Sequence, residues 1–401
     1  MGRIDEIITD ITGFDGLRSR MSTRNRRWFI RGGVAALRGL TGRHIFASGN
    51  ALNGRGSDLA LAISSGAGPV LRLLMQRTPV FWLGRVREAH NPLAKFFCRT
   101  GLDPSDRCHA IVSLNGGVVI FGHVAGRPAV VHLPTSKSSY DQIMRYQHGL
   151  AFARSELADT DLARLLPELL TVSETHLVQS RTEGRFLDPI LLSGNQLTAA
   201  IIAGLNIAVS LHRVGQEREE ACRTSLVPAA LNDMLGTVGQ QGKEFIATAC
   251  AAVERWAPSM RLWSVPMHGD LWLGNLCFKE DLSCVTGVID WEWYDGHGLP
   301  LLDAIHLIMT SVAMHRRVPV SALLPQIWLG DDEYLCMLFD HACALFKVDR
   351  TLFQWMGIVE WLGLIARGSI EPRPSRFDTW LSDIVLAPGA AVCEWLASQR
   401  T

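Results

Sequence analysis

Two short stretches, HGDLWLGN (268–275) and GVIDWE (287–292), constrain this chain more than any other part of its sequence. The first contains a carboxylate, Asp270, and a carboxamide, Asn275, with four residues between them, so a single loop can present both side chains. The second adds another carboxylate, Asp290. Oxygen donors of this kind suit Mg²⁺, which takes one or two protein carboxylates and fills the rest of its shell with phosphate oxygens and water.

The residues between the two stretches predict a β-hairpin. Leu276–Phe278 and Val285–Ile289 are short apolar runs, and the polar turn 279–283 joins them. Such a hairpin begins beside the first stretch and ends at Asp290, so it brings the two stretches together in space. We therefore expect Asp270 and Asp290 to face the same ligand.

The interval between Asp270 and Asn275 also occurs in the catalytic loop of protein kinases, H-R-D-x-x-x-x-N. Phosphoryl transfer needs an acceptor hydroxyl held in line, a group that takes its proton, and cations that neutralise the polyphosphate. Asp270 fits the role of the catalytic base, and Asn275 and Asp290 fit the role of Mg²⁺ ligands. His268 is the second candidate catalytic residue, but its place in the loop favours a hydrogen bond that orients the loop over a proton transfer.

As a set, these motifs resemble those of the aminoglycoside phosphotransferase and choline kinase-like family, which carries HGD-x-x-x-x-N followed by a strand that ends in I-D-[WF]-E. The match continues at Gly298–Asp303, similar to the family's G-x-P-x-x-D, and at Leu211-His212, similar to its recurrent L-H. The resemblance implies an α+β, two-lobed protein-kinase-like fold, with a small antiparallel β-sheet N-lobe and a larger, mainly α-helical C-lobe. It also implies an ATP- and Mg²⁺-dependent kinase that phosphorylates a hydroxyl of a small molecule such as a sugar, amino sugar or amino alcohol. Asp303 is then expected to enter a helix and hold the catalytic loop.

Upstream, residues 108–133 predict three strands joined by two glycine-containing turns, which fits the sheet of a small lobe. Glycines in the first turn would let backbone N–H groups approach a polyphosphate, although an ordinary hairpin gives the same pattern. This candidate nucleotide-binding turn consists of Asn115, Gly116 and Gly117. A further strand, 175–181, resembles the segment that joins the two lobes in the family, and backbone groups near Gln179 and Arg181 would contact the edge of the adenine.

The third of these strands departs from the family. His132 stands where the family's phosphate-binding Lys is expected, and a histidine, with an ordinary pKa near 6.5, can be neutral where a lysine is charged. The helix predicted over 139–155 contains no Glu that would pair with such a Lys. Lys137 and Arg72 are the available cations, and Asp141 is the available acid.

This departure keeps a second hypothesis open, a non-catalytic kinase-like nucleotide-binding module (pseudokinase). A third hypothesis is a hydrolase that uses His268, Asp270 and Asp290 around a transition metal. Such a site normally has a richer set of histidine ligands, so the third hypothesis has the least support.

Length and composition fit a two-lobed enzyme. A chain of 401 residues, of which 48% are hydrophobic, can bury two cores. We assign residues 1–100 to an N-terminal extension or part of the small lobe, 101–183 to the N-lobe, and 184–401 to the C-lobe with the catalytic loop and metal site. The 39 basic and 39 acidic residues balance, so the charge shows no sign of a nucleic-acid partner.

The remaining features favour a cytoplasmic protein. Nine cysteines without a CxxC pair are typical of reduced thiols. Arg26-Arg27 resembles a twin-arginine export motif. The apolar segment that follows, residues 32–37, has only six weakly apolar residues before Arg38, which is too short for the apolar region of a signal sequence. No run of 18 apolar residues is present, so we expect no membrane span. The sequence leaves the oligomeric state open, and the expected partner is the small-molecule hydroxyl acceptor.

Overall fold

The computed structural model divides the chain into two compact units. Unit 1 consists of residues 1–147 and 167–181, and unit 2 of residues 148–166 and 182–401. The structure describes residues 29–31, 34–38, 44–48, 82–83, 100–103, 108–112, 118–134, 137–173, 176–218, 221, 225–260, 262–367 and 377–399. Most of the predicted extension, including Arg72, lies outside these residues.

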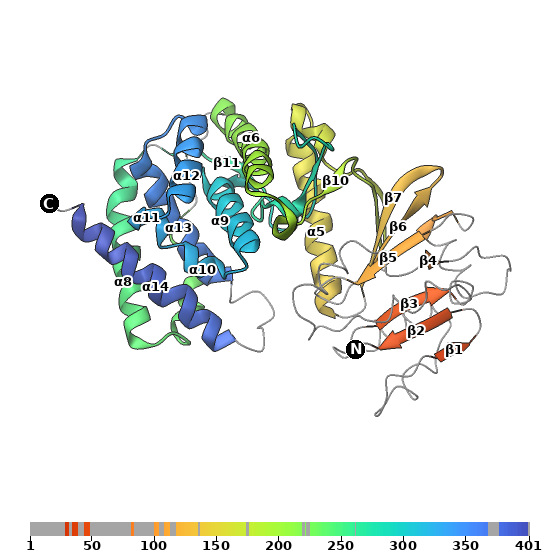
Figure 1. Ribbon diagram of the computed structural model, residues 1–401, viewed down its shortest axis with the longest axis horizontal. Helices are drawn as coiled ribbons and strands as arrows, with labels where there is room; N and C mark the ends of the chain where they lie inside the picture. Colours follow the sequence, from red (N-terminus) through yellow and green to blue (C-terminus); the bar gives the residue numbers. More distant parts are fainter. Residues whose placement is uncertain are drawn as a thin grey trace. The chain divides into compact units, whose positions relative to one another are not determined.

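Unit 1 is built around a six-stranded sheet with the order β4-β5-β6-β7-β9-β8, in which every neighbouring pair is antiparallel (Figure 1). Its strands are β4 (Trp82–Leu83), β5 (Cys108–Val112), β6 (Val118–Val124), β7 (Arg127–Leu133), β8 (Leu169–Val172) and β9 (Leu177–Ser180). A separate three-stranded sheet contains β1 (Phe29–Arg31), β2 (Val34–Arg38) and β3 (His44–Ser48). The three strands predicted over 108–133 are confirmed as β5, β6 and β7.

The turn between β6 and β7 shows why these strands form a tight hairpin. Ala125 and Gly126 both have positive φ angles, 50° and 76°, as a two-residue turn with the twist of a hairpin requires. Val124 then pairs with Arg127, and the register runs without a break to Val118 opposite Leu133. This register places His132 near the end of β7.

Helix α5 (Lys137–Glu156) follows β7 and is longer at both ends than the sequence predicts. The helix therefore does contain a Glu, which corrects the prediction of a Glu-free helix. That residue, Glu156, accepts a hydrogen bond from Arg218 at 2.9 Å in unit 2, so it already has a cationic partner.

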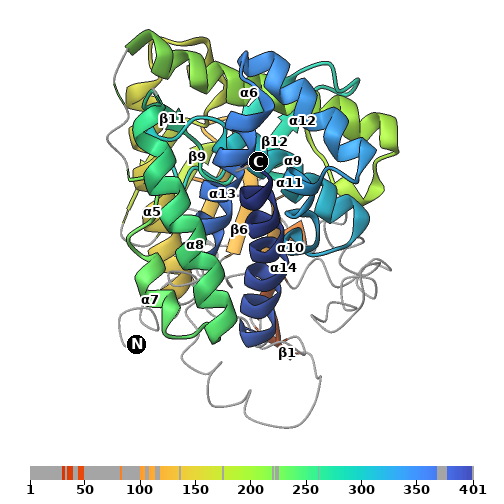
Figure 2. The same cartoon turned by 90° about the vertical axis from the view of Figure 1, so that its left-hand side faces the viewer.

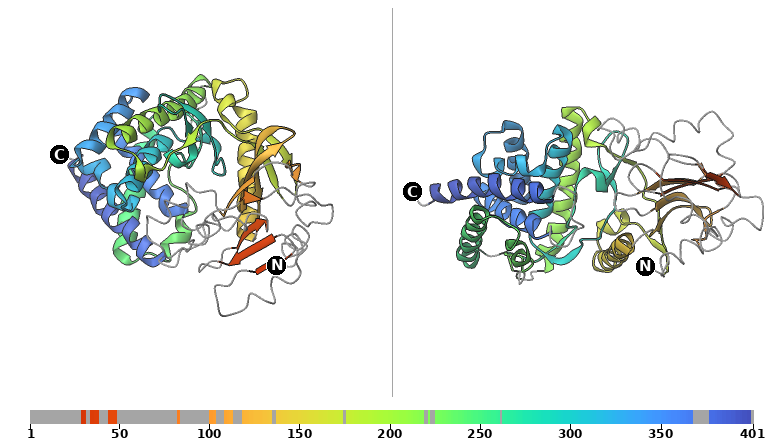
Figure 3. Two further views of the ribbon diagram at one scale, coloured as in Figure 1. Left: turned by 45° about the vertical axis from the view of Figure 1, so that its right-hand side comes forward. Right: turned by 90° about the horizontal axis from the view of Figure 1, so that it is seen from below.

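Unit 2 is mainly helical. Its long helices are α6 (Gly194–Arg218), α8 (Gln240–Trp256), α9 (Leu302–Arg316), α12 (Glu333–Phe346), α13 (Arg350–Arg367) and α14 (Phe377–Ser398), and its short ones are α7 (Leu231–Leu235), α10 (Val320–Leu323) and α11 (Gln326–Leu329). Helices α8 and α14 lie side by side (Figures 2 and 3). Large side chains that are fully buried, such as Trp361, Phe339 and Phe353, fill the space between the helices.

Among the described residues, α6 alone is long and apolar enough to cross a membrane by length and composition. Polar residues such as Asn206 and Ser210 interrupt its apolar sequence. Of its most apolar stretch, 61% is buried, as expected for the core helix of a folded unit.

Short strands of unit 2 carry the motifs. β11 (Val265–Met267) pairs with β14 (Asp295–Gly298), and β12 (Leu276–Phe278) pairs with β10 (Arg185–Phe186) on one side and with β13 (Val285–Val288) on the other. The predicted hairpin is confirmed as β12 and β13. With one unit built on an antiparallel sheet and the other mainly helical, the chain belongs to the predicted α+β class.

Candidate active site

The HGD loop begins directly after β11 and turns sharply at Gly269. This residue has a φ of +82°, and a Cβ atom there would lie 2.3 Å from the backbone oxygen of Trp293. Only glycine combines the left-handed backbone with so close an approach. The turn directs the next residue, Asp270, away from the strand.

His268 ties the loop to the end of the hairpin. Its Nδ1 accepts the backbone N–H of Asp270 at 3.3 Å, so the ring proton sits on Nε2, which donates to the carbonyl oxygen of Ile289 at 2.9 Å. Burial lowers the pKa of His268, and none of its surface is exposed. These contacts suit a neutral ring that orients the loop.

Asp303, in the first turn of α9, holds the same loop from the other side. Its two carboxylate oxygens accept the backbone N–H groups of His268 at 2.7 Å and Gly269 at 2.9 Å. Further along α9, the hydroxyl of Ser311 accepts the N–H of Leu273 at 3.2 Å. The loop-holding role predicted for Asp303 is confirmed by these bonds.

Asp270 and Asn275 lie within hydrogen-bonding distance of one another, as their spacing predicts. The Asn275 Nδ2 donates to the backbone oxygen of Asp270 at 2.8 Å and to its Oδ2 at 3.1 Å. Asp270 keeps 31% of its side chain exposed, whereas Asn275 is buried. The amide nitrogen therefore faces Asp270, and its oxygen is left for another partner.

The hairpin returns the chain to this loop at Asp290. The N–H of Ile289 donates to the backbone oxygen of Asn275 at 2.9 Å, and Asp290 follows with a φ of +67°. Burial, together with the negative charges of Glu292 and Asp270, raises the pKa of Asp290 to about 7. The structure thus brings His268, Asp270, Asn275 and Asp290 together.

The oxygen ligands of Asp290 and Asn275 suit Mg²⁺ better than a metal ion that takes all of its ligands from protein side chains. The Asp290 carboxyl, whose pKa is raised by burial and by the charges of Glu292 and Asp270, would gain from a nearby cation. Within the part of the chain that the structure describes, no group of three His, Cys, Asp or Glu side chains could hold a metal ion. A cation bound at Asp290 and Asn275 would therefore take its remaining ligands from phosphate and water, as Mg²⁺ does.

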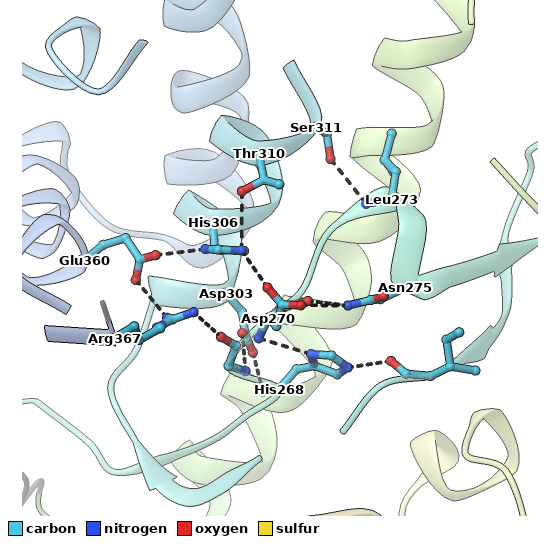
Figure 4. Close-up of polar contacts among 12 residues, drawn as sticks. His268, Asp270, Leu273, Asn275, Asp303, His306, Thr310, Ser311, Glu360 and Arg367 are labelled. Carbon is cyan, nitrogen blue, oxygen red and sulfur yellow. Dashed lines mark hydrogen bonds and ion pairs between the residues drawn. The ribbon is translucent and has the colours of Figure 1, made fainter. Parts of the chain in front are cut away.

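Three further residues form a charged chain behind Asp270 that the sequence analysis missed (Figure 4). His306 of α9 has its Nε2 3.1 Å from Asp270 Oδ1 and its Nδ1 2.9 Å from Glu360 Oε1 of α13. The other Glu360 oxygen lies 3.7 Å from Arg367 Nη2, and Arg367 Nη1 donates to the backbone oxygen of Gly269 at 2.8 Å.

Two features of the sequence could have indicated this series of charged residues. Glu360 is the only charged residue in the apolar run GIVEWLGLIA (357–366), and a buried charge in such a run requires a partner. On α9, Asp303, His306 and Thr310 are three and four residues apart, so they share one helical face. Neither feature identifies the residue that acts as the partner.

The candidate nucleotide residues of unit 1 have a different environment. His132 packs against Tyr146 of α5 with ring centroids 5.4 Å apart, and its Nε2 is buried without a hydrogen-bond partner. Burial lowers the pKa of His132 to about 4, so the ring is neutral at pH 7. Tyr146, and not Asp141, is thus the ring partner of His132, and Lys137 is exposed at the start of α5.

Gln179 and Arg181 lie at the end of β9. The buried Gln179 side chain accepts a hydrogen bond from the Tyr146 hydroxyl, and its backbone lies between β7 and β8. The Arg181 N–H donates to the carbonyl oxygen of Pro128 at 3.0 Å. The predicted turn at Asn115, Gly116 and Gly117 lies outside the described residues.

Comparisons with known proteins bear on the same region. The family model described as "Phosphotransferase enzyme family" matches residues 118–334, which contain the whole loop and hairpin. No curated protein sequence matches the chain.

Among solved structures, the chain is similar to ADP-bound aminoglycoside phosphotransferase APH(2'')-Ib, with 12% identity over 74% of this chain and 97% of that one and a TM-score of 0.47. It is similar to a thermostable mutant of aminoglycoside phosphotransferase APH(4)-Ia in complex with ADP and hygromycin B, with 13% identity over 76% and 97% of the two chains and a TM-score of 0.48. It is also similar to macrolide 2'-phosphotransferase MphH from Brachybacterium faecium, with 14% identity over 73% and 96% and a TM-score of 0.46.

Proposed function

Because the chain belongs to the phosphotransferase enzyme family and has its kinase-like fold, we propose that it transfers the γ-phosphate of ATP to a hydroxyl group of a small molecule in a Mg²⁺-dependent reaction. The expected acceptors are a sugar, an amino sugar or an amino alcohol. One observation carries the proposal: Asp270 is partly exposed, is bonded to Asn275, and lies in the electrostatic field of Asp290.

Asp270 is the group that takes the proton of the acceptor hydroxyl. Burial raises its pKa, but the hydrogen bond and charge of His306 outweigh burial and hold the pKa below its usual range. The carboxylate is therefore ionised when an acceptor arrives. His268 and Asp303 position the backbone of the loop, and neither touches the acceptor.

Asn275 and Asp290 are the proposed metal ligands. Asn275 directs its amide nitrogen to Asp270, which leaves its amide oxygen for a cation. Burial and neighbouring negative charges raise the pKa of Asp290, and no basic group of the described residues opposes them. Bound Mg²⁺ would neutralise charge on the transferred phosphoryl group.

We assign the nucleotide to residues of the proposed N-lobe, 101–183, and the acceptor chemistry to the proposed C-lobe, 184–401. The N–H of Arg181 is occupied, so the adenine would bond to the carbonyl oxygen of Arg181 or to groups beyond it. His132 is an uncharged ring, and Asn115, Gly116 and Gly117 would supply backbone N–H groups to the phosphates.

A second candidate is a non-catalytic nucleotide-binding module. The neutral His132–Tyr146 pair favours it, because that pair supplies no positive charge to a phosphate. The intact Asp270, Asn275 and Asp290 constellation favours the kinase.

The test is the melting temperature with ATP, with Mg²⁺, and with both, for the wild type, Asp290→Asn and Asp281→Asn. Asparagine keeps the side-chain volume and tolerates the positive φ at position 290. Asp281 is an exposed acid on the same hairpin and serves as the matched control.

For a kinase, we expect a large shift that needs both ligands, that persists in Asp281→Asn and that is lost in Asp290→Asn, together with a phosphoproduct by ³¹P NMR from an acceptor panel. A shift in melting temperature with ATP that does not depend on Mg²⁺, with no phosphoproduct, would favour the binding module. No shift with any ligand would contradict both.

A further inference from the structure

We propose that His306 is a positioning residue that holds the Asp270 carboxylate in its reactive orientation, and that Glu360 and Arg367 fix His306 in turn. This inference rests on the proposed function, because it assigns a role within that reaction. It concerns three residues that no sequence motif of the family indicated.

The hydrogen bonding of the imidazole indicates its protonation state. Each ring nitrogen of His306 lies within 3.1 Å of a carboxylate oxygen, Asp270 Oδ1 at 3.1 Å and Glu360 Oε1 at 2.9 Å. Ionised carboxylates only accept hydrogen bonds, and a neutral imidazole has a single N–H. Both bonds can form at once only when the ring is a doubly protonated imidazolium.

The charges around the buried His306 ring are balanced. His306 is 8% exposed and Glu360 is 2% exposed. Two negative and two positive groups alternate along the chain Asp270, His306, Glu360 and Arg367. Removing one member leaves its buried neighbour unpaired, which is more costly than the pair itself is favourable.

The series of contacts from Asp270 through His306, Glu360 and Arg367 returns to the HGD loop. Arg367 donates to the backbone oxygen of Gly269, the residue that precedes Asp270 (Figure 4). The carboxylate of Asp270 and its own backbone are thus tied to the same assembly of α9 and α13. Such a closed arrangement restricts both the position and the rotation of the carboxylate.

The charged state of His306 follows from the groups that face it. Burial lowers its pKa, but hydrogen bonds to Asp270 and Glu360 raise the pKa to about 9, and Arg367 opposes them. The Thr310 hydroxyl lies 3.3 Å from Nε2. An imidazolium has no site for another proton, so His306 orients Asp270 and does not relay the proton that Asp270 receives.

The test compares His306→Gln, Glu360→Gln, their double variant and the control His315→Gln. Glutamine at 306 keeps a donor for Asp270 but carries no charge. His315 also lies on α9 and bonds to the carbonyl oxygen of Pro189, away from Asp270. All four are checked for folding by circular dichroism.

We expect His306→Gln to lower kcat by about 100-fold with KM values for ATP and acceptor changed by less than about 3-fold, since misplacing a reacting group by about 1 Å has that effect. As a single substitution, Glu360→Gln should lower kcat. In the His306→Gln background it should lower kcat by less than about 3-fold more, because the two residues act as a unit. His315→Gln should behave like the wild type. Equal kcat in His306→Gln and wild type, or multiplicative effects in the double variant, would overturn the inference.

A second readout does not depend on activity. The ring ¹⁵N shifts of His306, assigned by their absence in His306→Gln, should report two protonated nitrogens at pH 7.5 in the wild type and a neutral ring in Glu360→Gln. A neutral ring in the wild type would overturn the inference. If the wild type phosphorylates no acceptor, the proposed function fails, and the ¹⁵N measurement still decides the state of His306.

Discussion

The carboxylate of Asp303 accepts the backbone N–H of His268 at 2.7 Å, and this bond fixes the HGD loop to the start of α9. Its second oxygen accepts the N–H of Gly269 at 2.9 Å. Both bonds are buried, so no water replaces them if they are lost. The orientation of Asp270 therefore depends on a residue that does not touch the reacting groups.

Asp303→Asn should destabilise the protein by about 1–3 kcal/mol and lower kcat, because the new amide group faces a backbone N–H that then has no acceptor. Urea unfolding and steady-state kinetics would measure both effects. Asp331→Asn changes an exposed acid and should leave both unchanged. Wild-type stability in Asp303→Asn would show that the two bonds do not hold the loop.

Gly149 on α5 lets the helix approach the loop that follows Asp290. A Cβ at Gly149 would lie 1.9 Å from the backbone oxygen of Trp291, whereas a Cβ at Gly363 of α13 would meet nothing within 4 Å. We expect Gly149→Ala to destabilise by about 1–3 kcal/mol through overpacking. Gly363→Ala should stabilise by about 0.5–1 kcal/mol through helix propensity. Thermal unfolding of both variants distinguishes crowding from propensity, and equal changes would contradict the close approach.

His132 should make stability depend on pH. Its pKa is lowered from 6.5 to about 4 in the folded state, so the unfolded chain binds its proton first as the pH falls. The contribution is fully present above pH 6.5 and is lost as the pH falls toward 4, by at most about 3 kcal/mol. His132→Leu should flatten this part of the profile, and His148→Gln, at an exposed position, should not. An unchanged slope in His132→Leu would show that the pKa of His132 is the same in the folded and the unfolded chain, and would contradict the lowered value.

Features set by short-range pattern were predictable from the sequence. The hairpin of β12 and β13 follows from two apolar runs and a polar turn, and it accounts for the approach of Asp290 to Asn275. The hairpin of β6 and β7 follows from Ala125 and Gly126 in the same way. Helix ends were less accurate: α5 extends to Glu156, which bonds to Arg218, a residue distant in the sequence.

The partners of Asp270 could not be predicted because they depend on how helices pack. His306 lies 36 residues from Asp270, and Glu360 lies 54 residues beyond His306. A lone acid in an apolar helix indicates that a partner exists, but the packing of α9 against α13 selects it. The sequence shows His132 in place of the expected Lys, but its packing against Tyr146 likewise appears only in three dimensions.

In the proposed reaction, Asp270 takes the proton of the acceptor. The direct measurement is Asp270→Asn, in which the side chain keeps its volume and an oxygen for His306 but cannot accept the proton. We expect the Kd for Mg²⁺-ATP by calorimetry to change by less than about 3-fold, and phosphoryl transfer by ³¹P NMR to fall by at least about 100-fold, the usual contribution of a general base. Turnover close to that of the wild type, with nucleotide binding intact, would contradict the account.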